Sequence, residues 1–131
     1  MAKEYEILDV WIGRFPTESA FAEYLSESYS DDDSLPISRL AADMGEGFYD
    51  HDFLERSFHE LSPSDLRSCL EPHSFSPSYS AAAARAFESV SLPAFNSILL
   101  VWGEQFSHPV SVHHEDHWLH YLGRFACDPR A

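Results

Sequence analysis

The N-terminal segment 4–15, EYEILDVWIGRF, constrains the fold more than any other part of the chain, because it is apolar on both faces of an extended backbone. The side chains of a strand alternate between its two faces. Both alternating sets are apolar here: Tyr5, Ile7 and Trp11 on one face, and Leu8, Val10 and Ile12 on the other. A strand of this kind is usually central in its sheet. We therefore expect segment 4–15 to form a central strand.

Helix signals fill the middle of the chain. Thr17 is placed to cap a helix whose apolar stripe includes Phe21 and Tyr24, and Gly45 is placed to end a second, shorter helix. Two Ser-Pro pairs mark further helix starts, with Ser62 and Ser76 as the expected N-caps, and the alanine run after Ser76 favours a helix strongly. The predicted helices cover segments 17–28, 35–45, 62–70 and 76–90.

Segment 47–58, GFYDHDFLERSF, concentrates acidic and aromatic residues between two of these helices. Asp50 or Asp52 can cap a helical turn that carries Phe53, Leu54 and Phe58, whose spacing fits one helical face. The carboxylates could instead contact a partner protein, or serve as an acid/base pair, a role that usually needs burial to raise one pKa. The residues alone leave these three roles open.

Two apolar strands are expected near the C-terminus, over segments 97–102 and 117–127. The element order is thus one strand, a block of helices, then further strands. This order predicts an α+β fold in a single domain over residues 1–131: a small, mainly antiparallel sheet with helices packed on one face. A doubly wound α/β fold would need a regular alternation of strands and helices, which the sequence does not show.

Net charge is the strongest global signal. Twenty-two acidic residues against eight Lys and Arg residues give −14 at neutral pH. Such a field repels nucleic acid and anionic membranes and attracts basic proteins, although solubility alone would also account for it. With no apolar run of about 20 residues and a charged start, the chain is expected to be soluble and cytoplasmic. Cys69 and Cys127 are expected to be free thiols.

The sequence contains one candidate for enzymatic chemistry. There is no Gly-x-Ser-x-Gly elbow and no Gly-rich phosphate loop. Histidines crowd into segment 113–120, HHEDHWLH, and three or four converging ligands could bind zinc. On a helix His113 and His117 would share a face, whereas on a strand His120 lies on the opposite face from both. A small metal-dependent hydrolase, using the Asp/Glu residues and this segment, is therefore the alternative hypothesis.

Three stretches of the chain together resemble the immunity protein 22 family: VWIGRFPTESAFAEYL, ADMGEGFYDHDFLERSF and the C-terminal YLGRF. The similarity runs along most of the chain in the same order. Trp11, Gly13 and Phe15 match the opening motif of the family. The central motif is matched by Tyr49, Asp50, Asp52, Phe53 and Glu55. The histidines of segment 113–120 are not part of the resemblance.

The resemblance implies a non-enzymatic α+β protein, without catalytic residues, metal or cofactor, that binds a cognate bacterial toxin domain and blocks it inside the producing cell. Charge favours a basic toxin, such as a nuclease, because an acidic binder can find a basic partner rapidly. We expect Asp50, Asp52 and Glu55 to contact the toxin and the acidic run Asp31, Asp32 and Asp33 to steer its approach. Trp11 and Phe15 are expected in the core.

Overall fold

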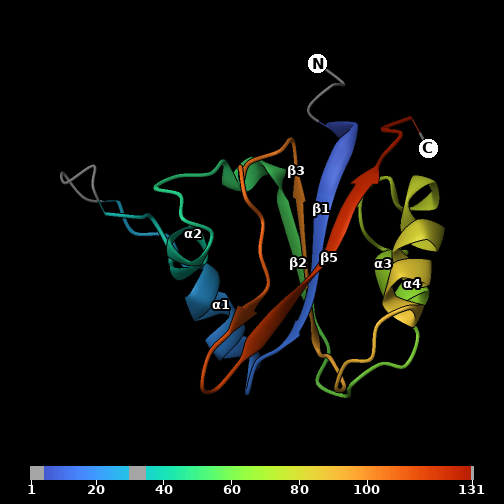
Figure 1. Cartoon of the computed structure of the whole chain (residues 1–131), viewed down its shortest axis with the longest axis horizontal. Helices are drawn as coiled ribbons and strands as arrows, with labels where there is room; N and C mark the ends of the chain where they lie inside the picture. The colour runs from blue at the N-terminus through green and yellow to red at the C-terminus, as the bar shows by residue number, and fades with distance from the viewer. Residues whose placement is uncertain (1–4, 30–34, 131) are drawn as a thin grey trace.

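The computed structural model describes residues 5–29 and 35–130 and contains a five-stranded antiparallel sheet (Figure 1). The strand order is β2-β3-β1-β5-β4. β1 (Ile7–Arg14) lies in the middle, between β3 (Ser97–Trp102) and β5 (Trp118–Ala126), as its two apolar faces predict. β2 (Leu54–Phe58) and the short β4 (Val112–His113) form the two edges.

The helices cover both faces of this sheet. α1 (Glu18–Leu25) and α2 (Arg39–Asp43) lie on one side, and α3 (Leu66–Leu70) and α4 (Ser80–Glu88) lie on the other (Figure 1). The predicted α+β class and antiparallel sheet are confirmed, but the expectation that helices pack on one face alone is corrected. The physical reason is that β3 is buried at every position and β1 at most, so both faces of the central strands need an apolar cover.

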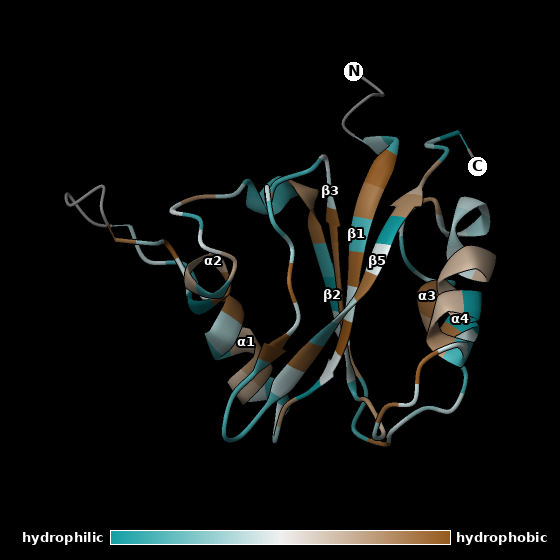
Figure 2. Ribbon diagram, in the orientation of Figure 1, coloured by the Kyte–Doolittle hydropathy of each residue, from teal (hydrophilic) through white to brown (hydrophobic). Residues whose placement is uncertain are grey.

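Each face of the sheet has its own core. The first core gathers around Trp11 and Phe15, with Phe21 and Tyr24 of α1 and Leu40 of α2. The second core lies on the opposite face: Leu8, Val10 and Ile12 of β1 pack with residues of α3, α4 and the alternate positions of β3. The hydropathy colours follow this arrangement, because β1 and β3 are brown along most of their length while the outer helix faces are mixed (Figure 2). Trp11 and Phe15 are core residues, as predicted.

The predicted helix caps are partly confirmed. Thr17 caps α1 by accepting a 3.0 Å hydrogen bond from the Ala20 amide, and Gly45 follows α2 with a φ of 72°. Asp65, rather than Ser62, caps α3. A 3₁₀ turn, Ser76–Ser78, precedes α4, which starts only at Ser80.

Segment 54–58 is a strand, where a helical face was predicted. Leu54 and Phe58 are four residues apart, and this spacing puts them on one face of a helix and equally on one face of a strand. Pairing with β3 decides between the two, because β2 aligns antiparallel with it from Leu54–Val101 to Phe58–Ser97.

Cys69 and Cys127 are both free, as predicted. Within residues 5–29 and 35–130, no helix has the length and apolar character needed to cross a bilayer.

Candidate functional site

The acidic pair Asp50 and Asp52 lies at the start of a 3₁₀ turn, His51–Phe53, that leads into β2. Asp50 is the N-cap of this turn, since its Oδ1 accepts a 3.0 Å hydrogen bond from the Asp52 amide. The Asp50 amide in turn donates to Oε1 of Gln105 at 2.9 Å. The side chain of Asp52 is 78% exposed and lies 3.5 Å from Nε2 of His51. The capping role is confirmed for Asp50, which is half-buried, whereas the carboxylate of Asp52 is exposed.

Glu55 lies on the opposite face of β2 from the side chains that pack toward α1. Its Oε1 is 2.9 Å from Nδ1 of His73 and accepts a 3.1 Å hydrogen bond from the Ser74 amide, while its Oε2 accepts from the Ser74 hydroxyl. Partial burial alone would raise the pKa of Glu55, but the hydrogen bonds from Ser74 and His73 hold it below its ordinary value. The structure therefore does not bring Glu55 together with Asp50 and Asp52.

Glu55, His73 and Ser57 form a carboxylate–imidazole–hydroxyl chain. Nε2 of His73 lies 3.2 Å from Oγ of Ser57, so the order of groups is that of a nucleophilic triad. Glu55 also holds Ser74, however, and all four residues join β2 to the turn that follows α3. These contacts give the hydrogen-bonded series a structural role, because they anchor the turn on the edge strand.

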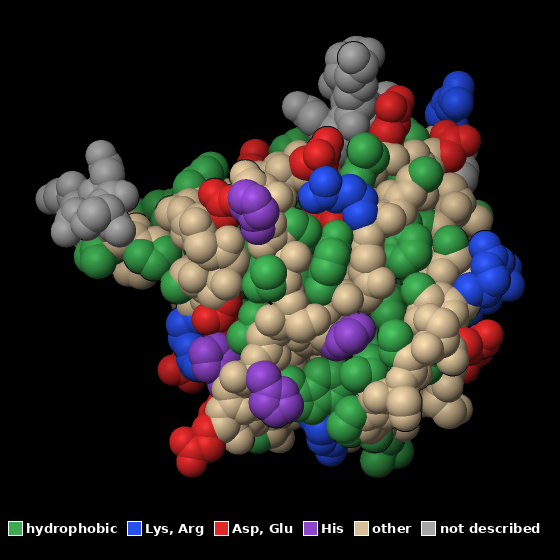
Figure 3. Space-filling view, in the orientation of Figure 1, with side chains coloured by type: hydrophobic (Ala, Val, Ile, Leu, Met, Phe, Trp, Pro, Cys, Tyr) green, Lys and Arg blue, Asp and Glu red, His purple; other side chains and the backbone are tan. Residues whose placement is uncertain are grey.

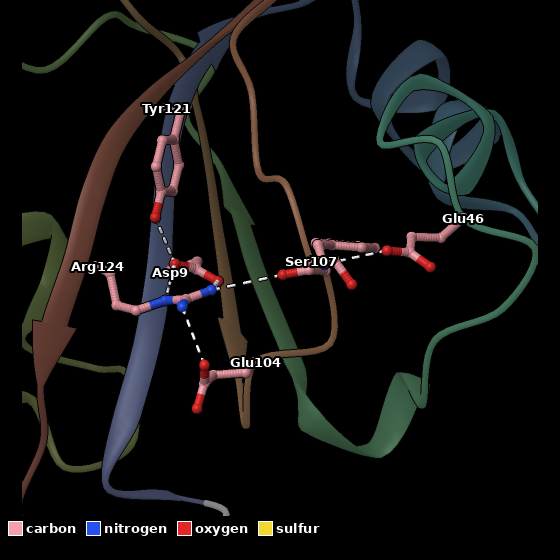
Figure 4. A network of polar contacts seen from close by, with 7 residues as sticks. Asp9, Glu46, Glu104, Ser107, Tyr121 and Arg124 are labelled. Atoms are coloured by element: carbon pink, nitrogen blue, oxygen red, sulfur yellow. Dashed lines mark hydrogen bonds and ion pairs between the residues drawn. The ribbon is translucent and has the colours of Figure 1, made fainter.

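A second polar network involves the loop that follows β3 (Figure 4). This loop also contacts Asp50 through Gln105. Ser107 donates its amide to Oε2 of Glu46 at 3.0 Å, and Glu104 accepts a 3.0 Å bond from Nη1 of Arg124. Together with the bond between Asp50 and Gln105, these contacts tie loop 103–107 to the segments that carry Glu46 and Asp50. The segment that carries Glu46 and Asp50 thus holds a loop that itself carries Glu104.

Arg124 also pairs with Asp9, a fully buried carboxylate in the middle of β1. Its Nε and Nη2 lie 2.9 and 3.0 Å from the two carboxylate oxygens, and Oη of Tyr121 donates to Oδ1 of Asp9 at 2.5 Å (Figure 4). Burial and this hydrogen bond raise the pKa of Tyr121. This network is not among the features predicted from the sequence. A single acid inside an apolar central strand is nevertheless a usable signal, because a buried charge needs a partner.

The acidic residues do not merge into one block on the face seen in Figure 3. Asp and Glu side chains lie toward its margins, and the middle is mainly uncharged and apolar, with histidines. On this face, the acidic residues therefore form no continuous patch.

The histidine-rich segment forms the hairpin between β4 and β5. His117 is buried, with its ring stacked on Phe15 at a centroid distance of 4.4 Å and its Nδ1 2.8 Å from Asp116. His114 reaches Asp43 through a 2.9 Å contact. Across the described ranges, no group of three or more His, Cys, Asp or Glu side chains could hold a metal ion. The hydrolase hypothesis therefore gains no ligand set from these residues.

Comparison with known protein families identifies a match over most of the chain. The model of the family described as Immunity protein 22 aligns with residues 8–128, from the second residue of β1 to just beyond β5. The chain belongs to this family. No curated protein and no solved structure matches it. Membership supports an immunity role that works by binding a cognate toxin protein.

Proposed function

We propose that this Immunity protein 22 family member neutralises a basic bacterial toxin domain, such as a nuclease, in the cytoplasm of the producing cell by binding it through acidic residues. Family membership is the observation that carries the proposal. The net charge of −14 supports a positively charged partner, because complementary electrostatic fields accelerate the encounter of two proteins.

Asp50 and Asp52 are the proposed contacts. Among the described residues, no Lys or Arg side chain forms an ion pair with either carboxylate. Both are therefore free to accept charge-assisted hydrogen bonds from a partner's Arg or Lys. Asp50 is also held in place before binding by its hydrogen bonds with the Asp52 amide and with Gln105. This lowers the conformational entropy that is lost on association.

Glu55 and the run Asp31–Asp33 complete the proposed set. Glu55 could reach a toxin only from the other face of β2, so its contribution is tested apart from that of the pair. Asp31, Asp32 and Asp33 lie outside the described residues, and the role proposed for them is to steer the encounter.

The test measures binding to the C-terminal domain of a large secreted protein encoded immediately upstream. We expect that purified domain to bind the immunity protein and to lose its toxicity on co-expression. The double variant Asp50→Asn/Asp52→Asn should weaken binding by about tenfold to a hundredfold, as expected for charged hydrogen bonds. Glu55→Gln is measured separately, with its thermal midpoint.

The matched control is Glu71→Gln/Glu88→Gln, which removes the same charge from exposed positions beside α3 and α4. It should change the affinity much less than the Asp50/Asp52 variant. Equal losses in the two double variants would show that only overall charge matters, and absence of binding by the wild-type protein would refute the proposed function.

A further inference from the structure

A groove runs between helix α1 and the outer edge of strand β2. One hollow of about 300 Å³ is lined by Glu18, Ser19, Phe21 and Ala22 of α1 and by residues 56–58 of β2. A second, of about 360 Å³, is lined by Ala22, residues 25–27, Tyr49, His51, Leu54 and Arg56. Ala22 and Arg56 border both hollows, so the two form one groove along the strand.

The floor of this groove is an unpaired strand edge. Among the residues that the structure describes, β2 pairs only with β3. The amide just after β2, that of His59, donates toward the β3 side, to the Asn96 carbonyl at 2.8 Å. Amide directions alternate along a strand, so those of Glu55 and Ser57 also point to β3, while those of Arg56 and Phe58 point outward. No backbone hydrogen bond on this side of residues 55–58 is formed by the described part of the chain.

The other edge of the sheet is less suited to accept a strand. There β4 already pairs with the first residues of β5, and the Tyr121 amide is taken by Oγ of Ser111. A register shift opposite Val10 and Trp11 then disrupts the ladder of β5, and irregularities of this kind protect an edge against pairing. β2 has no such irregularity in its pairing with β3.

The charges along the groove alternate. Arg56 is exposed at its centre and forms no ion pair within the described ranges. Glu18 lies at one end, and Glu27 lies at the other, with its Oε1 3.3 Å from Nδ1 of His51. A segment that fits these charges carries an acidic side chain in its middle and basic side chains on either side.

We propose that this groove binds an extended segment of the toxin, which pairs with β2 as a sixth strand and places a carboxylate on Arg56. This inference rests on the proposed function and names the part of the partner that the protein recognises. Main-chain bonds to an exposed edge supply affinity in this mode, and side chains at alternate positions supply specificity. A second copy of this chain fits less well, because two molecules of charge −14 repel each other.

The first experiment fills the groove. Ala22→Trp places a large ring where the two hollows meet, and Glu23→Trp places the same ring on the exposed side of the same helix. The probe is the purified toxin domain encoded upstream. We expect Ala22→Trp to weaken its binding at least a hundredfold and Glu23→Trp to change it less than threefold, with similar thermal midpoints for both variants.

The second experiment does not depend on tolerance of the tryptophan. Arg56→Gln should weaken binding by about tenfold, as for a lost charged hydrogen bond. The control Arg85→Gln, at an exposed position of α4, should have no effect on binding. Hydrogen exchange at the amides of Arg56 and Phe58 should slow on addition of the toxin domain.

The outcomes separate the two proposals. If the wild-type protein does not bind the toxin domain, the proposed function and the groove inference both fail. If it binds but the two amides stay unprotected and Arg56→Gln binds like Arg85→Gln, the groove inference alone is overturned. A toxin-free dimer that Ala22→Trp dissociates would show that a second copy, not the toxin, is the occupant.

Discussion

The carboxylate of Asp9 lies on the central strand β1. It is fully buried, and Arg124 neutralises it through two hydrogen bonds. Removing one partner of such a pair leaves an uncompensated charge in the protein interior, a loss of about 3–5 kcal/mol for a fully buried pair. The side chain of Arg124 is 34% exposed, so solvent reduces this cost.

We predict that Arg124→Gln lowers the free energy of unfolding by about 2 kcal/mol, measured by urea denaturation. Asp9→Asn in the Arg124→Gln background should restore part of the loss, because the buried group is then neutral. The control Arg130→Gln breaks the exposed contact with Asp128 and should have no measurable effect on the same curve. An unchanged unfolding midpoint for Arg124→Gln would contradict the prediction.

His117 is predicted to make stability depend on pH. Burial lowers its pKa below the ordinary value near 6.5, although the hydrogen bond with Asp116 acts in the opposite direction. The folded protein therefore holds His117 neutral while the unfolded chain binds a proton more readily. Its contribution to stability is complete above about pH 6.5 and is lost as pH falls toward the lower pKa of the folded state.

The measurement is the free energy of unfolding between pH 7.5 and pH 5. The wild-type protein should lose stability over this range, and His117→Phe, which can still stack on Phe15, should show a flatter profile. His113→Gln, at an exposed position of the same hairpin, should keep the wild-type slope. Identical slopes for wild type and His117→Phe would assign the pH dependence to other groups.

The pairing of β1 with β5 depends on the absence of a side chain at Gly13. A Cβ at this position would lie 2.3 Å from the carbonyl oxygen of Trp118 and 2.8 Å from a methyl carbon of Leu119. The backbone oxygen cannot move without disturbing the ladder. We predict that Gly13→Ala costs about 2–3 kcal/mol of unfolding free energy, as for overpacked cores.

The control for this change is Gly47→Ala, since a Cβ there would meet nothing within 4 Å. It should leave stability unchanged or raise it slightly by restricting the unfolded chain. Calorimetric unfolding of both variants decides the matter. Similar midpoints for the two would mean that β5 shifts freely to accommodate the methyl group.

Local signals in the sequence are sufficient to predict most of the helices and strands. β1 and β3 were predictable because their apolar residues occur in continuous runs, and the Thr17 cap was predictable because capping depends on neighbours in the chain. β2 was not, since a spacing of four residues suits a helix and a strand equally and only the pairing with β3 decides.

The candidate site was predictable only where its contacts are local. The cap by Asp50 spans two residues. Glu55, in contrast, turns away from Asp50 because segment 54–58 is extended, so the error in secondary structure also misplaced this side chain. The pair of Asp9 and Arg124 joins residues 115 positions apart, and neither neighbourhood in the sequence identifies the other.

Coverage of both sheet faces determines which surfaces of the molecule remain available for a partner. α1 and α2 cover one face and α3 and α4 cover the other, so the edges and the loops at the strand ends are left. The Asp50–Asp52 pair lies at the beginning of the free edge strand β2, beside the groove that Arg56 and Ala22 border. The proposed acidic contacts and the proposed strand-binding groove are therefore parts of one continuous surface.

The charge of the whole molecule predicts how binding responds to salt. A net charge of −14 would attract the proposed basic toxin over distances comparable to the Debye length, which shortens from about 30 Å at 0.01 M salt to about 8 Å at 0.15 M. Screening acts on the encounter, whereas the proposed contacts in the groove and at Asp50, once formed, are largely shielded from ions. Raising salt over this range should therefore lower the association rate by about tenfold or more and change the dissociation rate far less.

Stopped-flow kinetics with the upstream-encoded domain measures both rates. The control variant Glu71→Gln/Glu88→Gln should reduce the salt dependence of association slightly without altering dissociation. Equal salt effects on the two rates would mean that charge acts within the bound interface and not in steering.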